Sequence, residues 1–129
     1  MTDPLSDFFI QIKNGYRARK GAVVVPFSNL KSEIARVLEA RKYIGSYEKK
    51  GRKVRKFLEL KLLYDDGKPS LTEVRLLSKP SRRLYVGVDK IRPVRQGHGL
   101  LIVSTSKGVM TGEDAKKERI GGQLIAEVW

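Results

Sequence analysis

The stretch LLIVSTSKGVMTGEDAKKERIGG, residues 100–122, decides the fold class of the second half of this chain. Its apolar, β-branched run at 100–103 predicts a buried strand that extends into STSKG at 104–108. Serine and glycine favour turns, so this segment is expected to turn the chain into a second short strand that ends at VMT. A helix-forming segment, TGEDAKKER at 111–119, follows at once. The order strand, turn, strand and helix predicts mixed α and β structure.

The segment 111–119 carries the signals of a short helix. Thr111 is expected to cap it, and Asp114 lies three residues later, as in the T-x-x-D form of a capping box. Gly121 and Gly122 are expected to end the helix, because glycine is the preferred residue just past a helix C-terminus.

The rest of the second half also predicts short strands. With the two above, the expected strands are LTEVRLL (71–77), RLYVGV (83–88), GLLIVSTS (99–106), KGVMT (107–111) and GGQLIAEVW (121–129). Leu84, Val86 and Val88 alternate with Tyr85, so Tyr85 is expected to point away from their apolar face. One short helical turn is expected at DKIRPV, residues 89–94.

Residues 1–66 alternate between helical and strand patterns and predict an N-terminal α/β module of order α-β-α-β-β. The expected elements are a helix at 2–20, a strand at 22–27, a helix at 28–45 capped by Ser28, and a hairpin at 44–64 that turns at 49–53. The turn-rich stretch DDGKPS at 65–70 separates this module from a mostly β C-terminal module at 67–129. The chain is therefore expected to have an α+β fold made of two small modules.

Two local expectations concern the helix ends of the first module. Thr2 or Asp3 is expected to cap the first helix, and Asn14 with Gly15 is expected to weaken or end it. Arg41 and Lys42 are expected in the last turn of the second helix, where cations suit the helix dipole.

Composition points to a polyanionic partner. The 129 residues include 27 Lys and Arg against 14 Asp and Glu, a formal net charge of +13, which favours nucleic acid over an acidic membrane face. The absence of cysteine excludes disulfides, Cys-ligated zinc and thiol catalysis. The single histidine, His98, lies between glycines and is interpreted as a turn residue, so no metal or cofactor is expected. No apolar run approaches the roughly 20 residues of a membrane span, and the N-terminus lacks a signal-peptide pattern.

Four interpretations of the loop STSKG are compared with its residues. A phosphate-binding P-loop is excluded, because its glycines must precede the lysine. Ser104 and Lys107 have the Ser-x-x-Lys spacing of some serine hydrolases, but no partner motifs accompany them. A plain polar hairpin and an RNA-binding loop remain the other two interpretations.

The neighbouring sequence favours RNA. Hydroxyls and backbone N–H groups of Ser104, Thr105, Ser106 and Gly108 suit phosphate, ribose and base edges, and Lys107 adds a positive charge. An exposed Tyr85 behind Arg82 and Arg83 is suited to stack on a base or ribose. Six cations in KKGRKVRK, residues 49–56, are expected to contact phosphate backbone and add affinity without sequence choice.

Four segments, in order, resemble the family of bacterial small-subunit ribosomal protein S8. They are TDPLSDFFIQIKNG, VPFSNLKSEIARVL, SKPSRRLYVGV and STSKGVMTGEDAKKERIGGQLIAEVW. The resemblance implies an N-terminal α/β and a C-terminal mostly β module, no enzymatic activity, and primary binding to the central domain of 16S rRNA during small-subunit assembly. It also implies a cytoplasmic location in the ribosome, contact with other small-subunit proteins, a monomer outside the ribosome, and, in some bacteria, repression of the protein's own operon mRNA.

The same resemblance assigns RNA contacts to particular residues. They are Ser104, Thr105, Ser106, Lys107 and Gly108, then Tyr85, Gly121 and Gly122, and, through the N-terminal module, positions near Thr2, Asp3, Pro4 and Lys31. Two positions depart from the family pattern, since many members have an acidic residue in place of Gln123 and Asp in place of Gly112. Two rivals are kept beside this interpretation: a serine-lysine hydrolase at Ser104 and Lys107, and a general RNA chaperone without a fixed site.

Overall fold

The computed structural model describes residues 4–79, 82–93 and 98–129. The chain divides into two compact units, 1–72 and 73–129, which are described separately. The turn-rich stretch at 65–70 forms a small hairpin of β4 (Tyr64–Asp65) and β5 (Lys68–Pro69). The expected division between residues 66 and 67 stays a prediction.

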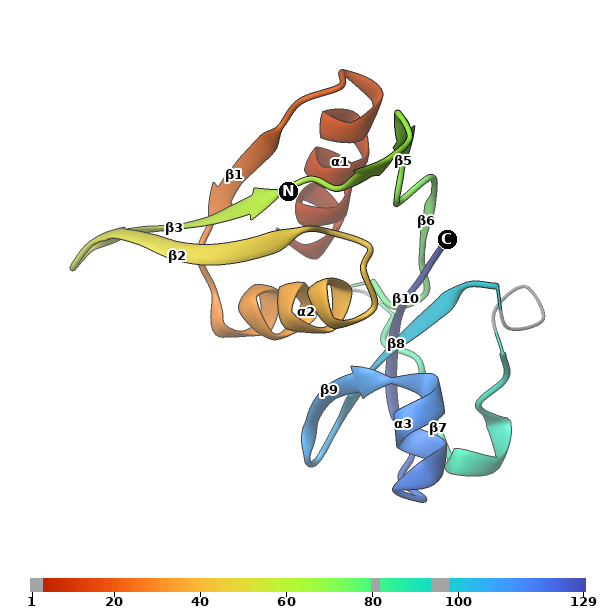
Figure 1. The fold of residues 1–129 in the computed structure, drawn as a ribbon. Helices are drawn as coiled ribbons and strands as arrows, with labels where there is room; N and C mark the ends of the chain where they lie inside the picture. The colour runs from red at the N-terminus through yellow and green to blue at the C-terminus, as the bar shows by residue number, and fades with distance from the viewer. Residues whose placement is uncertain (1–3, 80–81, 94–97) are drawn as a thin grey trace. The chain divides into compact units, whose positions relative to one another are not determined.

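The first unit contains the expected order α-β-α-β-β (Figure 1). Its elements are α1 (Pro4–Arg17), β1 (Ala22–Pro26), α2 (Asn29–Ala40), β2 (Ser46–Arg52) and β3 (Arg55–Lys61), followed by β4 and β5. The three long strands form an antiparallel sheet in the order β1-β3-β2. This confirms the α/β character of the N-terminal half.

The core of the first unit lies on one face of this sheet. Val23, Val25, Leu58 and Leu60 are buried there, whereas Val24, between the two valines, is exposed. The helices present their own apolar sides, since 3.6-residue spacing gathers these residues into stripes: Phe8, Phe9, Ile12 and Tyr16 from α1, and Ile34, Ala35, Val37 and Leu38 from α2. On the opposite face, called the open face below, the described side chains of Val24 and Phe57 are exposed.

The helix ends of this unit only partly match expectation. Ser28 caps α2 as predicted, because its Oγ accepts a hydrogen bond from the N–H of Lys31 at 3.1 Å. Arg41 is the C-cap of α2, so Arg41 and Lys42 lie beyond the last turn and not within it. The caps expected from Thr2 or Asp3 lie outside the described residues.

Gly15 was expected to weaken or end α1, because glycine has a low helix propensity, but it does not end the helix. The helix continues to Arg17, and a Cβ at Gly15 would lie 2.4 Å from Cγ1 of Val23. The glycine therefore lets β1 approach the helix. At the next residue, the hydroxyl of buried Tyr16 donates to the carbonyl of Tyr43 at 2.6 Å and accepts from the N–H of Leu63 at 3.1 Å. Burial raises the pKa of Tyr16.

The hairpin of β2 and β3 turns later than the sequence predicted. Arg52 pairs with Arg55, so the turn is at residues 53 and 54 and not at 49–53. Gly51 is instead part of β2, with φ +103°, and a Cβ there would lie 2.0 Å from the carbonyl oxygen of Arg55. Glycine is needed inside the strand because L residues rarely adopt this backbone conformation.

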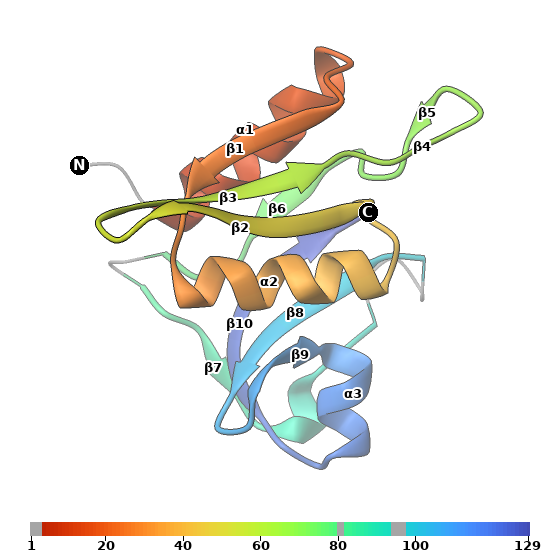
Figure 2. The same ribbon diagram turned by 60° about the vertical axis from the view of Figure 1, so that its left-hand side comes forward.

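The second unit is mostly β. It contains β6 (Val74–Leu76), β7 (Tyr85–Val86), a 3-10 turn η1 (Val88–Lys90), β8 (Leu100–Thr105), β9 (Gly108–Thr111), α3 (Gly112–Lys117) and β10 (Gly122–Val128). The antiparallel sheet has the order β6-β10-β8-β9, and β7 also pairs with β10 (Figure 2). The five expected strands are all present.

A small apolar cluster holds α3 and the sheet of the second unit together. It consists of Ile91, Leu101, Val103 and Ala115. Thr111 caps α3 as expected, since its Oγ1 accepts from the N–H of Asp114 at 2.9 Å. The expectation that glycines end the helix was wrong: α3 ends at Lys117, and Arg119 takes the left-handed conformation with φ +57°.

Candidate RNA-binding surface

The loop STSKG is the turn between β8 and β9, and its own side chains build it. The hydroxyl of Thr105 donates to the carbonyl of Gly108 at 2.8 Å and accepts from the N–H of Lys107 at 3.1 Å. Gly108 has φ +112°, which favours glycine. Thr105 therefore fixes the turn, and Ser106 and Lys107 are exposed at its end.

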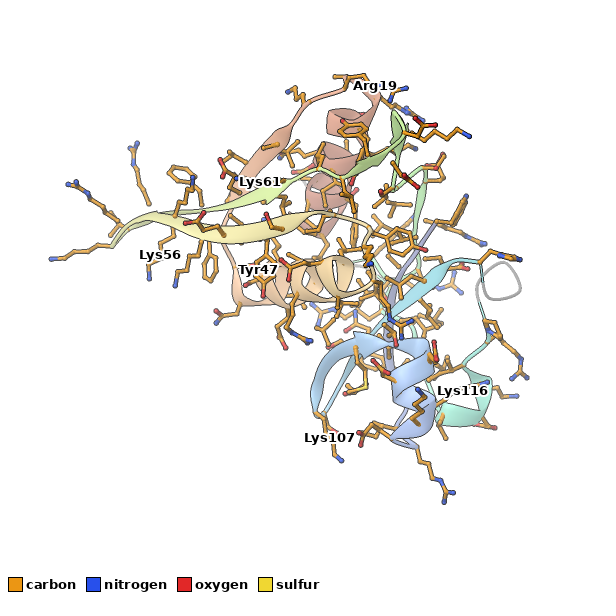
Figure 3. All side chains as sticks on the ribbon, viewed as in Figure 1. Arg19, Tyr47, Lys56, Lys61, Lys107 and Lys116 are labelled. Atoms are coloured by element: carbon orange, nitrogen blue, oxygen red, sulfur yellow. The ribbon has the colours of Figure 1, made fainter. Side chains whose placement is uncertain are left out.

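Lys107 reaches from this turn toward α3 (Figure 3). Its Nζ lies 3.3 Å from Oε2 of Glu118, and both side chains are more than half exposed. Exposed ion pairs contribute little free energy, so Lys107 is available to exchange Glu118 for a phosphate. A hydrolase would instead need Lys107 to activate Ser104, which is at the end of a strand and not on a helix turn.

The strand register brings Tyr85 and Ser104 to one face of the sheet. Tyr85 pairs with Gln123 of β10, and Gln123 pairs with Ser104 of β8. Directly paired residues of antiparallel strands point to the same face, and two strand spacings amount to roughly 10 Å. Tyr85 is 65% exposed. The side chains of Tyr85, Gln123 and Ser104 form a row. The sequence did not predict Gln123 at its centre, because only the pairing of distant strands places it there.

The glycine pair has a structural reason to be glycine. A Cβ at Gly122 would lie 2.3 Å from the carbonyl oxygen of Ser104, and one at Gly121 would lie 2.3 Å from that of Val86. Neither distance is possible for a real side chain without moving the neighbouring backbone. These glycines therefore let β10 lie tightly between the segments that carry Tyr85 and Ser104.

Ser78 fixes the segment that leads to Tyr85, and sequence reasoning did not identify it. This buried serine donates its hydroxyl to the carbonyl of Leu124 and accepts from the N–H of Leu84 at 2.9 Å. The local sequence gives one signal for this role, namely that Ser78 lies between apolar residues and a turn. Leu84, expected on an apolar face with Val86 and Val88, is 36% exposed, because β7 is only two residues long.

The two arginines before Tyr85 are exposed, as a phosphate contact requires. The backbone of Arg82 pairs with that of Lys79 through hydrogen bonds of 2.8 and 2.9 Å, which anchors the start of this segment. The side chains of Arg82 and Arg83 therefore extend from a backbone held on both sides, by Lys79 and by Ser78.

Ser78→Ala is expected to lower the free energy of unfolding by about 2 kcal/mol, since two buried backbone groups lose their partner. We also expect weaker RNA binding, because Tyr85 is no longer held in place. A urea melt followed by the fluorescence of Trp129, combined with an RNA titration, measures both effects. Ser78→Thr retains the hydroxyl and serves as the control; an alanine variant of full stability would contradict the positioning role.

Two of the N-terminal candidates, Pro4 and Lys31, line a hollow of the first unit. Lys31 is only 7% exposed, and its Nζ donates to the carbonyl of Pro26 at 3.4 Å. The hollow has a volume of about 280 Å³, and its lining is Pro4, Asp7, Phe8, Gln11, Val25, Pro26 and Lys31. The structure thus places Pro4 and Lys31 together, whereas Thr2 and Asp3 lie outside the described residues.

Within residues 4–79, 82–93 and 98–129, no group of three or more His, Cys, Asp or Glu side chains is placed to hold a metal ion. None of the helices described is long and apolar enough to cross a membrane. His98 is exposed.

Known proteins resemble this chain over its whole length. The family described as ribosomal protein S8 matches residues 3–129. Proteins named small ribosomal subunit protein uS8 are 40% identical in Persephonella marina, covering 100% of this chain and 99% of the relative, and 42% identical in Vesicomyosocius okutanii, covering 100% and 98%. A protein of the same name in Mycoplasmopsis agalactiae is 38% identical over 100% of this chain and 98% of its own length. With a family match over nearly every residue and full-length relatives near 40% identity, this chain belongs to the ribosomal protein S8 family.

Proposed function

We propose that this chain is a structural protein of the small ribosomal subunit that binds the central domain of 16S rRNA directly and supports subunit assembly. The observation that carries the proposal is the turn at 104–108, where Thr105 holds Ser106 and Lys107 exposed beside the row of Tyr85, Gln123 and Ser104. The names of its relatives support the ribosomal role.

Each part of this surface has a distinct chemical task. Ser106 and the backbone of Gly108 offer hydrogen bonds to ribose, phosphate or base edges, and Lys107 neutralises a phosphate after releasing Glu118. Tyr85 stacks on an unpaired base or ribose, which is worth about 1–3 kcal/mol. Arg82 and Arg83 add phosphate contacts on the approach to Tyr85. Such a set of groups suits an irregular RNA surface better than a regular helix.

The remaining contacts follow the family pattern. Backbone contacts from the first unit lie near Thr2, Asp3, Pro4 and Lys31. Gly121 and Gly122 let RNA or the adjacent strands approach closely. The protein acts without enzymatic chemistry and without a cofactor. It works in the cytoplasm within the ribosome, next to other small-subunit proteins, is monomeric outside it, and binds its own operon mRNA where feedback operates.

Ser106→Ala tests the proposal, because it removes one hydroxyl and no charge. We expect about tenfold weaker binding to a 16S rRNA central-domain transcript, as a stranded hydrogen-bond partner costs about 1–3 kcal/mol. The salt dependence should not change, since no phosphate contact is lost. The free energy of unfolding should move by less than about 1 kcal/mol, because the serine is exposed. The measurement is a titration at two salt concentrations together with a urea melt, with Ser70→Ala as the control.

The rival functions predict other results. A plain hairpin loses stability and no RNA affinity, and an unspecific chaperone loses neither but yields to competition by bulk tRNA. A serine-lysine hydrolase cleaves an activated ester and stops doing so in Ser104→Ala. Unchanged affinity of the Ser106 variant would remove Ser106 from the site.

A further inference from the structure

The excess positive charge of the first unit is concentrated at one place. Residues 1–72 contain 16 Lys and Arg and 8 Asp and Glu, and six of these cations lie within residues 49–56, the basic tip. Without the basic tip the unit has 10 cations and 8 acids. The tip is the end of the β2–β3 hairpin, which extends past the helices of its unit (Figure 1).

Most of these cations have no carboxylate beside them. Lys50 pairs with Glu59 at 3.0 Å, and Nζ of Lys49 lies 4.4 Å from the centre of the Phe27 ring. For the part of the chain that the structure describes, no ion pair involves Arg52, Lys53, Arg55 or Lys56. These four side chains are exposed at the end of the hairpin. Like charges repel, so this cluster destabilises the end of the hairpin unless a polyanion neutralises it.

An exposed aromatic ring lies on the same hairpin, two residues after Arg55 and on the same face of the strand. Phe57 is 42% exposed and pairs with Lys50 across the strands, on the face opposite to buried Leu58. Lys56 and Lys61 point to different sides of the hairpin, in agreement with this alternation (Figure 3). Phe57 therefore belongs to the open face of the sheet. A flat apolar ring that shares a strand face with Lys50 and Arg55 suits a ligand that has both phosphates and stacked bases.

We propose that the basic tip and Phe57 form a second RNA contact, separate from the turn at 104–108. The four unpaired cations bind consecutive phosphates of the RNA backbone, and Phe57 packs on a base or ribose beside them. The identity of the RNA rests on the proposed function, because it is the same 16S rRNA. The residues of this second contact lie in the first unit, whereas the turn at 104–108 lies in the second. The contact adds affinity and salt dependence without choosing a sequence.

The tip can be located on RNA because the chain has no cysteine. Val54 is 95% exposed in the turn, so Val54→Cys introduces a single thiol for an iron chelate that generates hydroxyl radicals. When the labelled protein binds a 16S rRNA central-domain transcript, the reagent tethered at position 54 should cut one discrete RNA segment. The same reagent at Lys116→Cys, an exposed position of α3, should cut a different RNA segment. Cutting from this position shows that the labelled protein is bound. Cutting from position 116 without cutting from position 54 would overturn the proposal.

Charge neutralisation gives an independent test. The tip variant Arg52→Gln, Lys53→Gln, Arg55→Gln and Lys56→Gln should bind the transcript about tenfold more weakly, with a salt slope lower by about 2 to 3. The control is Arg17→Gln, Lys20→Gln, Lys42→Gln and Lys68→Gln, four exposed cations elsewhere in the same unit. An equal loss in both variants would show a general charge effect and contradict a local contact. Discrimination against bulk tRNA should persist in the tip variant and fall in Lys107→Ala.

Phe57→Ala tests the stacking part. We expect about fivefold weaker binding with an unchanged salt slope, whereas Val24→Ala, an exposed apolar residue of the same face without a ring, should have no effect. If the tip and Phe57 variants both bind RNA with unchanged affinity while Ser106→Ala still binds more weakly, this second contact is overturned and the proposed function is not. This outcome would also be expected if the basic tip binds an acidic protein. If Ser106→Ala also binds normally and position 116 cuts nothing, the proposed function fails instead.

Discussion

Gly122→Ala is expected to destabilise the second unit by about 3 kcal/mol. The new Cβ would lie 2.3 Å from the carbonyl oxygen of Ser104, so β8 and β10 must separate, and overpacking of this kind typically costs 1–3 kcal/mol or more. Trp129 follows β10 directly and is the only tryptophan, so its fluorescence reports this unit. With a urea m-value of about 2 kcal/mol/M, the midpoint should fall by roughly 1.5 M.

Gly21→Ala is the matched control, because no atom lies within 4 Å of a Cβ at that position. Its midpoint should stay close to that of the unchanged protein. Gly122→Ala should also bind the 16S rRNA transcript more weakly, since the row of Tyr85, Gln123 and Ser104 depends on this pairing. A variant of normal stability that no longer binds RNA would show that the glycine acts on RNA directly, and the packing explanation would be wrong.

The preference for irregular RNA should be the largest binding effect. We expect a bulged helical segment of the 16S rRNA central domain to bind on the order of a thousandfold more tightly than a perfect duplex of equal length at about 150 mM salt. Regular A-form RNA hides its base edges in a narrow major groove, whereas unpaired bases are accessible to Ser106 and can stack on Tyr85. Phosphate contacts alone cannot distinguish the two, because both carry the same charge density.

Chemical footprinting first locates the bound segment, and competition titrations then compare it with the duplex. Tyr85→Ala should reduce the preference and leave duplex binding nearly unchanged, while the tip variant should weaken both RNAs by a similar factor. Equal affinity for the bulged and perfect RNAs would contradict site-specific recognition and favour the chaperone.

Local and periodic signals were sufficient to predict the helices and the longer strands of both units, but not the small β4–β5 hairpin. Ser28 and Thr111 cap helices because the capping bond spans only three residues, and the alternation of Leu58 and Leu60 identifies the buried face of a strand without knowledge of its partner. The predicted end of α3 was wrong, because that prediction used only the local preference for glycine. Glycine is preferred after helices, but Arg119 adopts the left-handed conformation here, and Gly121 and Gly122 serve strand packing.

The α+β class, the order of strands and helices and the residue types of the loop at 104–108 follow from the amino-acid sequence alone, because they depend on residues that are neighbours in the chain. That Tyr85, Gln123 and Ser104 share a row follows from the three-dimensional fold, since their register depends on pairing between strands far apart in sequence. The three-dimensional fold also decides that Thr105 uses its hydroxyl to build the turn while Ser106 keeps an exposed one, because hydrogen-bond geometry, and not residue type, separates the two.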